Sequence, residues 1–101
     1  MRQQIAAIEQ AGRRWVIWGA GAKGVTFLNA LGIEATRMPY IVDINPRKHA
    51  RYVPGTAQEI VSPKRLVEYQ PGYVFVMNPL YLDEVRTTVR QLGLDCETRS
   101  I

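Results

Sequence analysis

The stretch WVIWGAGAKG, residues 15–24, decides the fold of this 101-residue chain. Four apolar residues are followed directly by the pattern G-x-G-x-x-G, and a second apolar run, residues 40–42, ends at Asp43 about 20 residues later. This order is typical of a strand, a tight turn that faces phosphate, a helix, and a second strand that ends near a ribose. The stretch therefore predicts a nucleotide-type pocket before it indicates any chemistry.

The spacing of apolar residues predicts alternating helices and strands along the whole chain. We expect helices over residues 2–11, 22–31, about 63–69 and about 78–92, and strands over 15–18, 40–43, 60–61 and 73–77, to which residues 94–99 can add an edge strand. Ser62 and Asn78 each precede a proline, so both are expected to cap the helix that follows.

Strands that alternate with helices indicate a parallel sheet. The predicted fold class is α/β: a Rossmann-like, doubly wound, mainly parallel sheet of four to five strands with helices on both faces. A chain of this length is expected to form one domain, residues 1–101.

Composition restricts the partners of the chain. Thirteen Lys and Arg residues against nine Asp and Glu leave a net charge of +4, and the basic residues are scattered, so no nucleic-acid partner is expected. No apolar stretch approaches the ~20 residues that span a bilayer, so no membrane partner is expected. Cys96 is the only cysteine, which excludes an intrachain disulfide and fits a reducing, cytoplasmic location.

In such a sheet a ligand binds outside the carboxyl ends of the strands. Gly19 permits the sharp turn, Gly21 lets the backbone approach a phosphate, and Gly24 lets the helix pack against the sheet. The start of that helix offers N–H groups and positive dipole charge to an anion. The predicted ligand-binding residues are Gly19, Ala20, Gly21, Ala22, Lys23, Gly24, Asp43, Asn45, Asn78 and Tyr81.

Several of these residues also have a structural interpretation. Lys23 is either a phosphate neighbour or a solvated lysine, and Asp43 either accepts from ribose hydroxyls or caps its own turn. Asn78 is a helix cap first and a ligand contact second, and Tyr81 either lines the crevice or packs on the helix. The glycine turn itself either holds a ligand or is kept for packing alone.

The sequence contains no paired carboxylates, no metal-ligand cluster and no Ser/His/Asp grouping, so no catalytic residue and no metal site are predicted. His49 lies in a polar loop, where a surface position is the default. The S-adenosylmethionine fingerprint usually has an acidic residue just before its glycines, and Trp18 occupies that place here. The methyl donor is therefore not expected at residues 19–24.

The ordered set of motifs resembles the C-terminal domain of S-adenosylmethionine-dependent C-methyltransferases, whose best-understood relatives act on nucleotide-activated deoxysugars. The motifs are the glycine turn with FLN and GI after it, IVDINP at 41–46, YVPGT at 52–56 and IVSP at 60–63. The resemblance implies a Rossmann-like domain that follows a zinc-binding region and a catalytic methyltransferase domain, and that helps to form the substrate side of the cleft.

The chain departs from the sugar-modifying relatives at residues 57–59 and at residues 77–81. Both segments are expected near the cleft, so they put the sugar substrate in question more than the family.

The resemblance implies an accessory domain that completes the acceptor pocket, docks on the catalytic domain and binds no cofactor itself, while S-adenosylmethionine is held by the catalytic domain. One alternative is a free-standing module that binds a nucleotide sugar or an NAD-type dinucleotide, which the glycine turn and Asp43 favour. A third is a packing module whose only partner is another protein chain.

Overall fold

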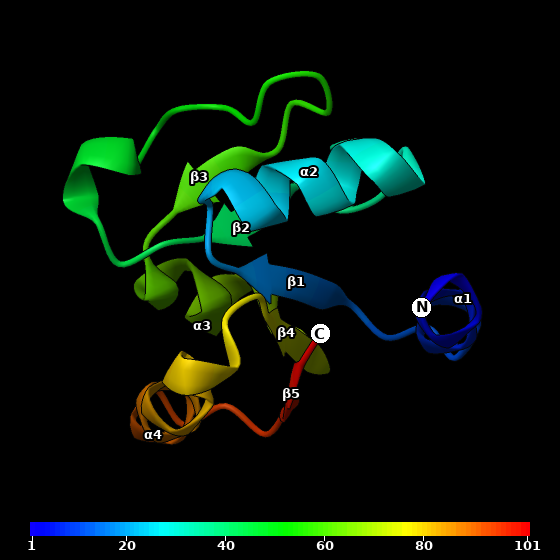
Figure 1. Cartoon of the computed structure of the whole chain (residues 1–101). Coiled ribbons are helices and arrows are strands. Elements are labelled where there is room, and N and C mark those ends of the chain that lie inside the picture. Colours follow the sequence, from blue (N-terminus) through cyan, green and yellow to red (C-terminus); the bar gives the residue numbers. More distant parts are fainter.

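A five-stranded parallel sheet with the order β3-β2-β1-β4-β5 forms the centre of the computed structural model, which describes all residues 1–101. The strands are β1 (Trp15–Trp18), β2 (Tyr40–Val42), β3 (Glu59–Val61), β4 (Tyr73–Val76) and β5 (Glu97–Ser100). The helices are α1 (Arg2–Gln10), α2 (Ala22–Leu31), α3 (Leu66–Tyr69) and α4 (Leu82–Gln91), with short 3-10 turns η1 (Pro46–Lys48), η2 (Pro63–Arg65) and η3 (Pro79–Tyr81). Figure 1 shows the helices on both faces of the sheet.

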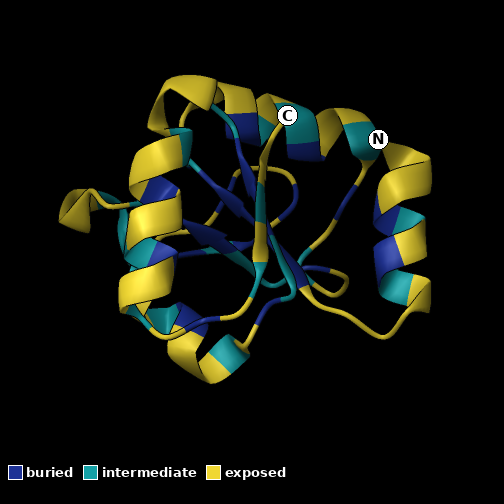
Figure 2. Cartoon of the chain, turned by 90° about the horizontal axis from the view of Figure 1, so that it is seen from below, coloured by how far each residue is buried: buried dark blue, intermediate teal, exposed yellow.

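Strand β1 is the innermost strand, paired in register with β2 on one side and β4 on the other. All four of its residues are buried, as expected of a parallel strand that is covered on both faces. Ile17 faces α1 and α2 together with Leu28 and Phe75, while Val16 and Trp18 face α3 and α4. The inner strands are therefore mostly dark in Figure 2, between helices whose outer faces are exposed, while the edge strand β5 is mostly exposed.

The structure confirms the predicted fold class, and it refines the bounds of the elements. The third strand includes Glu59, and residues 97–100 form the fifth strand parallel to β4. One local prediction is wrong: the side chain of Ser62 makes no capping hydrogen bond. Proline alone fixes the backbone at that helix start.

A second local prediction is also wrong, because residues 57–59 lie away from the carboxyl ends of the strands. Gln58 is fully buried, and its amide donates to the carbonyl oxygen of Ile33, at the C-terminal end of α2, at 2.7 Å. The hydroxyl of Thr56 donates to Gln58 Oε1. This buried pair fastens the loop to the amino-terminal edge of the sheet, where Glu59 begins β3.

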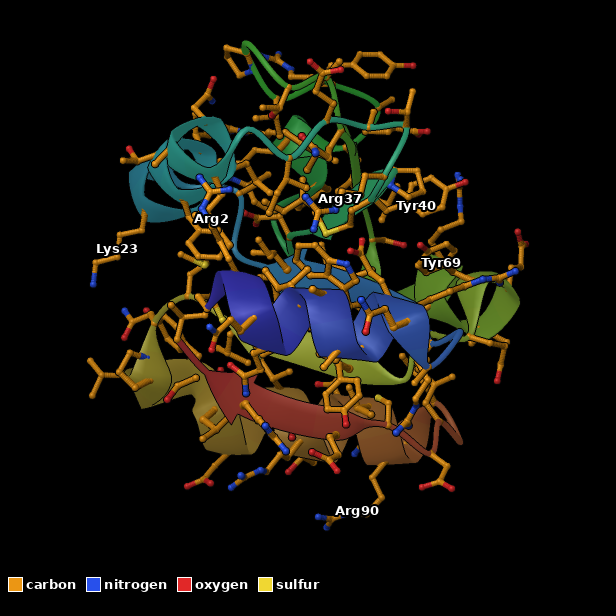
Figure 3. All side chains as sticks on the ribbon, turned by 90° about the vertical axis from the view of Figure 1, so that its right-hand side faces the viewer. Arg2, Lys23, Arg37, Tyr40, Tyr69 and Arg90 are labelled. Atoms are coloured by element: carbon orange, nitrogen blue, oxygen red, sulfur yellow. The ribbon has the colours of Figure 1, made fainter.

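Aromatic and arginine side chains cover that amino-terminal edge. Tyr40 and Tyr69 meet edge to face with ring centroids 5.2 Å apart, and the guanidinium groups of Arg65 and Arg14 lie over these two rings. Figure 3 shows the two tyrosines side by side at this end of the molecule. Burial raises the pKa of the Tyr69 hydroxyl above its ordinary value.

Helix α1 packs Ile5 and Ile8 into the core, and the carboxylate of Glu9 adds a polar attachment. Glu9 accepts two hydrogen bonds from Arg37 Nε and Nη2 at 2.9 Å each, and Trp15 Nε1 donates to it at 3.3 Å. The hydrogen bond from Arg37 lowers the pKa of Glu9 below its ordinary value. The pair therefore stays ionised well into the acidic range.

We expect Glu9→Gln to lower the free energy of unfolding by about 0.5–1 kcal/mol at pH 7, since both partners are partly exposed. Because the folded-state pKa is depressed, this stabilisation is fully present above the unfolded-state value of 4.5. It is lost as the pH falls through the folded-state pKa. Urea unfolding at pH 7 and at pH 3 measures the difference, and Glu68→Gln, an exposed glutamate without a partner, is the control. A difference that persists at pH 3 contradicts this account.

Candidate functional site

The glycine turn is held in shape by the close approach of α2 to the end of β1. Gly19 has a φ of +119°, a conformation that side chains disfavour. A Cβ atom on Gly24 would collide with the carbonyl oxygen of Gly19 and would lie 3.2 Å from Ile41 Cδ1. The first and third glycines of the motif are therefore required by the geometry of the turn, whatever binds there.

Asp43 connects the end of β2 to the glycine turn. One carboxylate oxygen accepts from the backbone N–H of Ala20 at 3.0 Å, and the other accepts from the N–H of Asn45 at 2.9 Å. Lys48 Nζ lies 3.7 Å from the first of these oxygens. Both carboxylate oxygens therefore hold backbone N–H groups in place. Asp43 is the only acidic residue among those that line the cavity at the start of α2.

Two asparagines shape the loops on either side of the turn. Asn45 Oδ1 accepts from the N–H of Arg47 at 3.0 Å, and Asn78 Oδ1 accepts from the N–H of Leu80 at 3.0 Å. Each asparagine precedes a proline that begins a 3-10 turn. The structural interpretation of Asn78 is therefore confirmed, because it caps η3, whereas Asn45, which was predicted only as a ligand contact, caps η1.

A crevice opens between these loops at the carboxyl ends of β1, β2 and β4. It consists of two adjoining cavities that share Trp18, Gly19, Asp43 and Tyr81. The α2 cavity, of about 360 Å³, also meets the start of α2, Lys48 and Asn78. The α4 cavity, of about 410 Å³, is completed by Ile44, Glu84, Val85 and Thr88.

The crevice brings most of the predicted site residues together. Gly19, Asp43, Asn78, Tyr81 and residues 21–24 line it. Ala20 and Asn45 lie outside both cavities, because Ala20 is 7% exposed and packs in the core while Asn45 turns onto its own loop. Figure 3 shows the Lys23 side chain extending away from the body of the molecule into solvent.

Lys48 and the four residues that complete the α4 cavity, Ile44, Glu84, Val85 and Thr88, were not predicted. A signal for the three on α4 exists in the sequence, because Tyr81, Glu84, Val85 and Thr88 follow a helical spacing that places them on one face. No comparable pattern identifies Lys48, since the 3-10 turn after Asp43 brings it to the cavity.

Both cavities have mainly apolar walls, and they differ in their charged groups. The α2 cavity combines the first N–H groups of a helix with two lysines, Lys23 and Lys48, and such a combination suits an anion. The α4 cavity is lined on several sides by apolar and aromatic side chains, of which Trp18 is 8% exposed and Ile44 is 69% exposed. It suits a flat or apolar group.

No nucleophile and base are paired in the crevice. His49 is partly buried, and its Nε2 lies 2.6 Å from the carbonyl oxygen of Asp43, so the ring is held against the backbone. Cys96 lies just before β5, at the opposite edge of the sheet, and burial raises the pKa of its thiol. No group of His, Cys, Asp and Glu side chains is arranged to hold a metal ion. None of the helices has the length and apolarity needed to cross a bilayer.

The sequence model of one protein family, described as the C-methyltransferase C-terminal domain, matches residues 1–95. The chain belongs to this family. A search of curated proteins found no match.

Crystal structures of RSP, a Rex-family repressor, resemble this C-methyltransferase C-terminal domain in fold. One matches with a TM-score of 0.64 and 15% identity over 98% of this chain and 58% of the other. RSP in complex with β-NADH matches with a TM-score of 0.62 and 14% identity over 88% of this chain and 53% of the other. RSP with β-NAD⁺ and operator DNA matches with a TM-score of 0.60 and 13% identity over 88% of this chain and 50% of the other. At such identities the likeness shows the Rossmann-like fold alone, and the domain spans little more than half of each repressor chain.

We expect Gly24→Ala to destabilise the domain by about 1–3 kcal/mol, because the added methyl group enters occupied space. Gly21→Ala is the matched control, since a Cβ there meets nothing within 4 Å and should change stability by less than about 0.5 kcal/mol. Urea unfolding followed by tryptophan fluorescence measures both. Equal stability of the two variants contradicts the close approach described here.

Asp43→Ala should lower the free energy of unfolding by about 1–3 kcal/mol, because the backbone N–H groups of Ala20 and Asn45 both lose the oxygen that accepts from them. The amide of Ala20 should also exchange faster with solvent. Asp95→Ala, at an exposed aspartate without a hydrogen bond, is the control. Unchanged exchange at Ala20 would show that the carboxylate does not hold the turn.

Proposed function

We propose that the chain is the accessory C-terminal domain of an S-adenosylmethionine-dependent C-methyltransferase, where it forms one wall of the acceptor-substrate pocket and contacts the catalytic domain. The two-part crevice is the observation on which the proposal rests. It offers an anion site beside an apolar cavity and has no paired nucleophile and base. Such a site fits binding and orientation of a substrate and leaves methyl transfer to another domain.

The residues at the glycine turn argue against S-adenosylmethionine as a ligand of this domain. Trp18 stands where donor sites of this kind have an acidic residue, and its side chain belongs to the core on the α4 face. The Asp43 carboxylate is already bonded to the turn itself. In the proposal the methyl donor is bound by the catalytic domain, and this domain holds no cofactor of its own.

A nucleotide sugar is the acceptor class that the crevice fits best. Its diphosphate would meet Lys48 and the start of α2, and a flat or apolar part would enter the α4 cavity. Met77, Asn78 and Tyr81 line the crevice, and they belong to the segment where the sequence departs from the sugar-modifying relatives. The acceptor is therefore proposed to differ from theirs in the part that contacts this segment. The free thiol of Cys96 supports a reducing, cytoplasmic location.

A second candidate is a free-standing module that binds an NAD-type dinucleotide. The structure of RSP with β-NADH favours it, because that protein shares the fold. The hydrogen bonds of Asp43 weigh against it, since both carboxylate oxygens already accept from the backbone. Ribose hydroxyls would have to share these oxygens.

Calorimetric titration and a methyl-transfer assay with labelled S-adenosylmethionine test the proposal. The chain should bind a uridine or thymidine diphosphate sugar, should give no heat with S-adenosylmethionine, and should transfer no methyl group alone. Lys48→Ala should weaken sugar-nucleotide binding about tenfold, which corresponds to about 1.4 kcal/mol. Arg90→Ala removes one positive charge outside the crevice, where Figure 3 shows Arg90 pointing into solvent, and should leave binding unchanged.

Methyl transfer by the chain alone, or tight binding of S-adenosylmethionine, would overturn the accessory role. Binding of NADH at least about tenfold tighter than that of the nucleotide sugars would instead favour the second candidate.

A further inference from the structure

We propose that two copies of this chain pair face to face through the rim of the crevice, so that each copy covers the crevice of the other. The rim patch consists of Ile44, Leu80 and Tyr81, whose exposed fractions are 69%, 84% and 52%. These residues follow β2 and β4, so all three lie at the carboxyl edge of the sheet. Large apolar side chains this exposed and this close to one another are typical of an interaction surface.

The loops that present the patch are built alike and are rigid. Each begins with an Asn-Pro pair, and in each the asparagine Oδ1 accepts from the N–H two residues later at 3.0 Å. The two turns, η1 and η3, project from the same edge of the sheet on either side of the glycine turn (Figure 1). The surface is therefore already formed before a partner arrives, which reduces the entropic cost of association.

Charge differs between the two ends of the rim patch. Arg47 lies in η1, beyond Ile44, and forms no salt bridge. Glu84, in the first turn of α4, lines the α4 cavity beside Tyr81 and also has no basic partner, while the neighbouring Asp83 pairs with Arg86 at 3.9 Å. A basic and an apolar group thus lie on the η1 side of the crevice, and an acidic and an apolar group lie on the η3 side.

This arrangement is self-complementary. A two-fold axis through the glycine turn reverses it, so that η1 of one copy meets η3 of the other, and Arg47 of each copy faces Glu84 of its partner. An isologous dimer requires such a surface, in which the same patch is matched to itself. The rim patch is small, so the pair is expected to be weak and dependent on concentration.

A second copy is the occupant that the charges favour, and this inference does not rest on the proposed function. The catalytic domain in that proposal would compete for the same face, so the pair is the state of the chain when that domain is not bound. If nucleotide binding or the accessory role fails its test, the proposed pairing is not affected. Calorimetry and methyl transfer measure the first two, and sedimentation measures the pairing.

Sedimentation velocity over a range of concentrations tests the pairing. The mass should rise from that of one chain, 11.5 kDa, towards twice that value between about 10 µM and about 1 mM. Leu80→Asp should weaken association at least about tenfold, because it places a charge at the centre of the contact. Val67→Asp is the matched control: Val67 is 46% exposed in α3, outside the rim, and its change should have no effect.

Charge reversal gives the sharper test. Arg47→Glu alone and Glu84→Lys alone should each remain monomeric, because like charges then face each other twice in the pair. Mixing the two variants should restore a dimer that contains one copy of each, and the double variant should also pair with itself. Misfolding of the single variants does not explain this pattern, because a misfolded chain would not regain the ability to pair when it is mixed with the other variant.

A chain that stays monomeric at about 1 mM overturns the proposal. Pairing that survives Leu80→Asp, or that mixing of the charge variants fails to restore, also overturns it, because the copies would then meet through another face.

Discussion

The Asp43 carboxylate is the interaction on which the geometry of the crevice depends. It bonds the end of β2 to the glycine turn after β1 through the N–H of Ala20, and it fixes its own loop through the N–H of Asn45. Hydrogen bonds from N–H groups to an ionised carboxylate are stronger than those between neutral groups. Two neighbouring strand ends are thereby held together, and the crevice opens beside them.

The acidic residue at the end of a second Rossmann strand is usually read as a ribose ligand. In this chain its oxygens already accept from backbone N–H groups. The groups in the crevice that suit an anion are Lys48 and the start of α2, while the Lys23 side chain extends into solvent. The ligand is therefore expected to be selected by its anion and by what fits against Trp18 and Tyr81 in the α4 cavity. In the proposed function, this domain binds the acceptor and shapes its pocket.

Sequence patterns predicted the sheet well because the signals in it are local. The apolar run at residues 15–18 and the glycines at 19, 21 and 24 fix a strand, a turn and a helix within one short segment. The lining of the crevice was predicted where it comes from that segment, from Asp43, and from Asn78 and Tyr81 after β4. The part of the α4 cavity that the helix itself contributes was missed, because it forms only when the last helix packs beside β1, which is a contact between distant parts of the chain.

Tertiary contacts also explain the local errors. Residues 57–59 were placed near the cleft, but burial of Gln58 against Ile33 draws them to the other edge of the sheet. Asn45 was assigned to the ligand site, but its side chain bonds to its own turn. Short polar side chains often prefer nearby backbone groups to a ligand, and the sequence alone does not show which choice a given residue makes.

The central claim is that a ligand enters the crevice between the glycine turn and α4. Nuclear magnetic resonance titration of the uniformly ¹⁵N-labelled chain with a nucleoside diphosphate sugar tests it most directly, because it locates the contact residue by residue. The account predicts that amide shifts change at residues 19–24, at Ile44 and Lys48, and along the face of α4 that includes Glu84 and Thr88. Changes centred on the amino-terminal edge, around Arg14 and Tyr69, or no changes at saturating ligand, would contradict it.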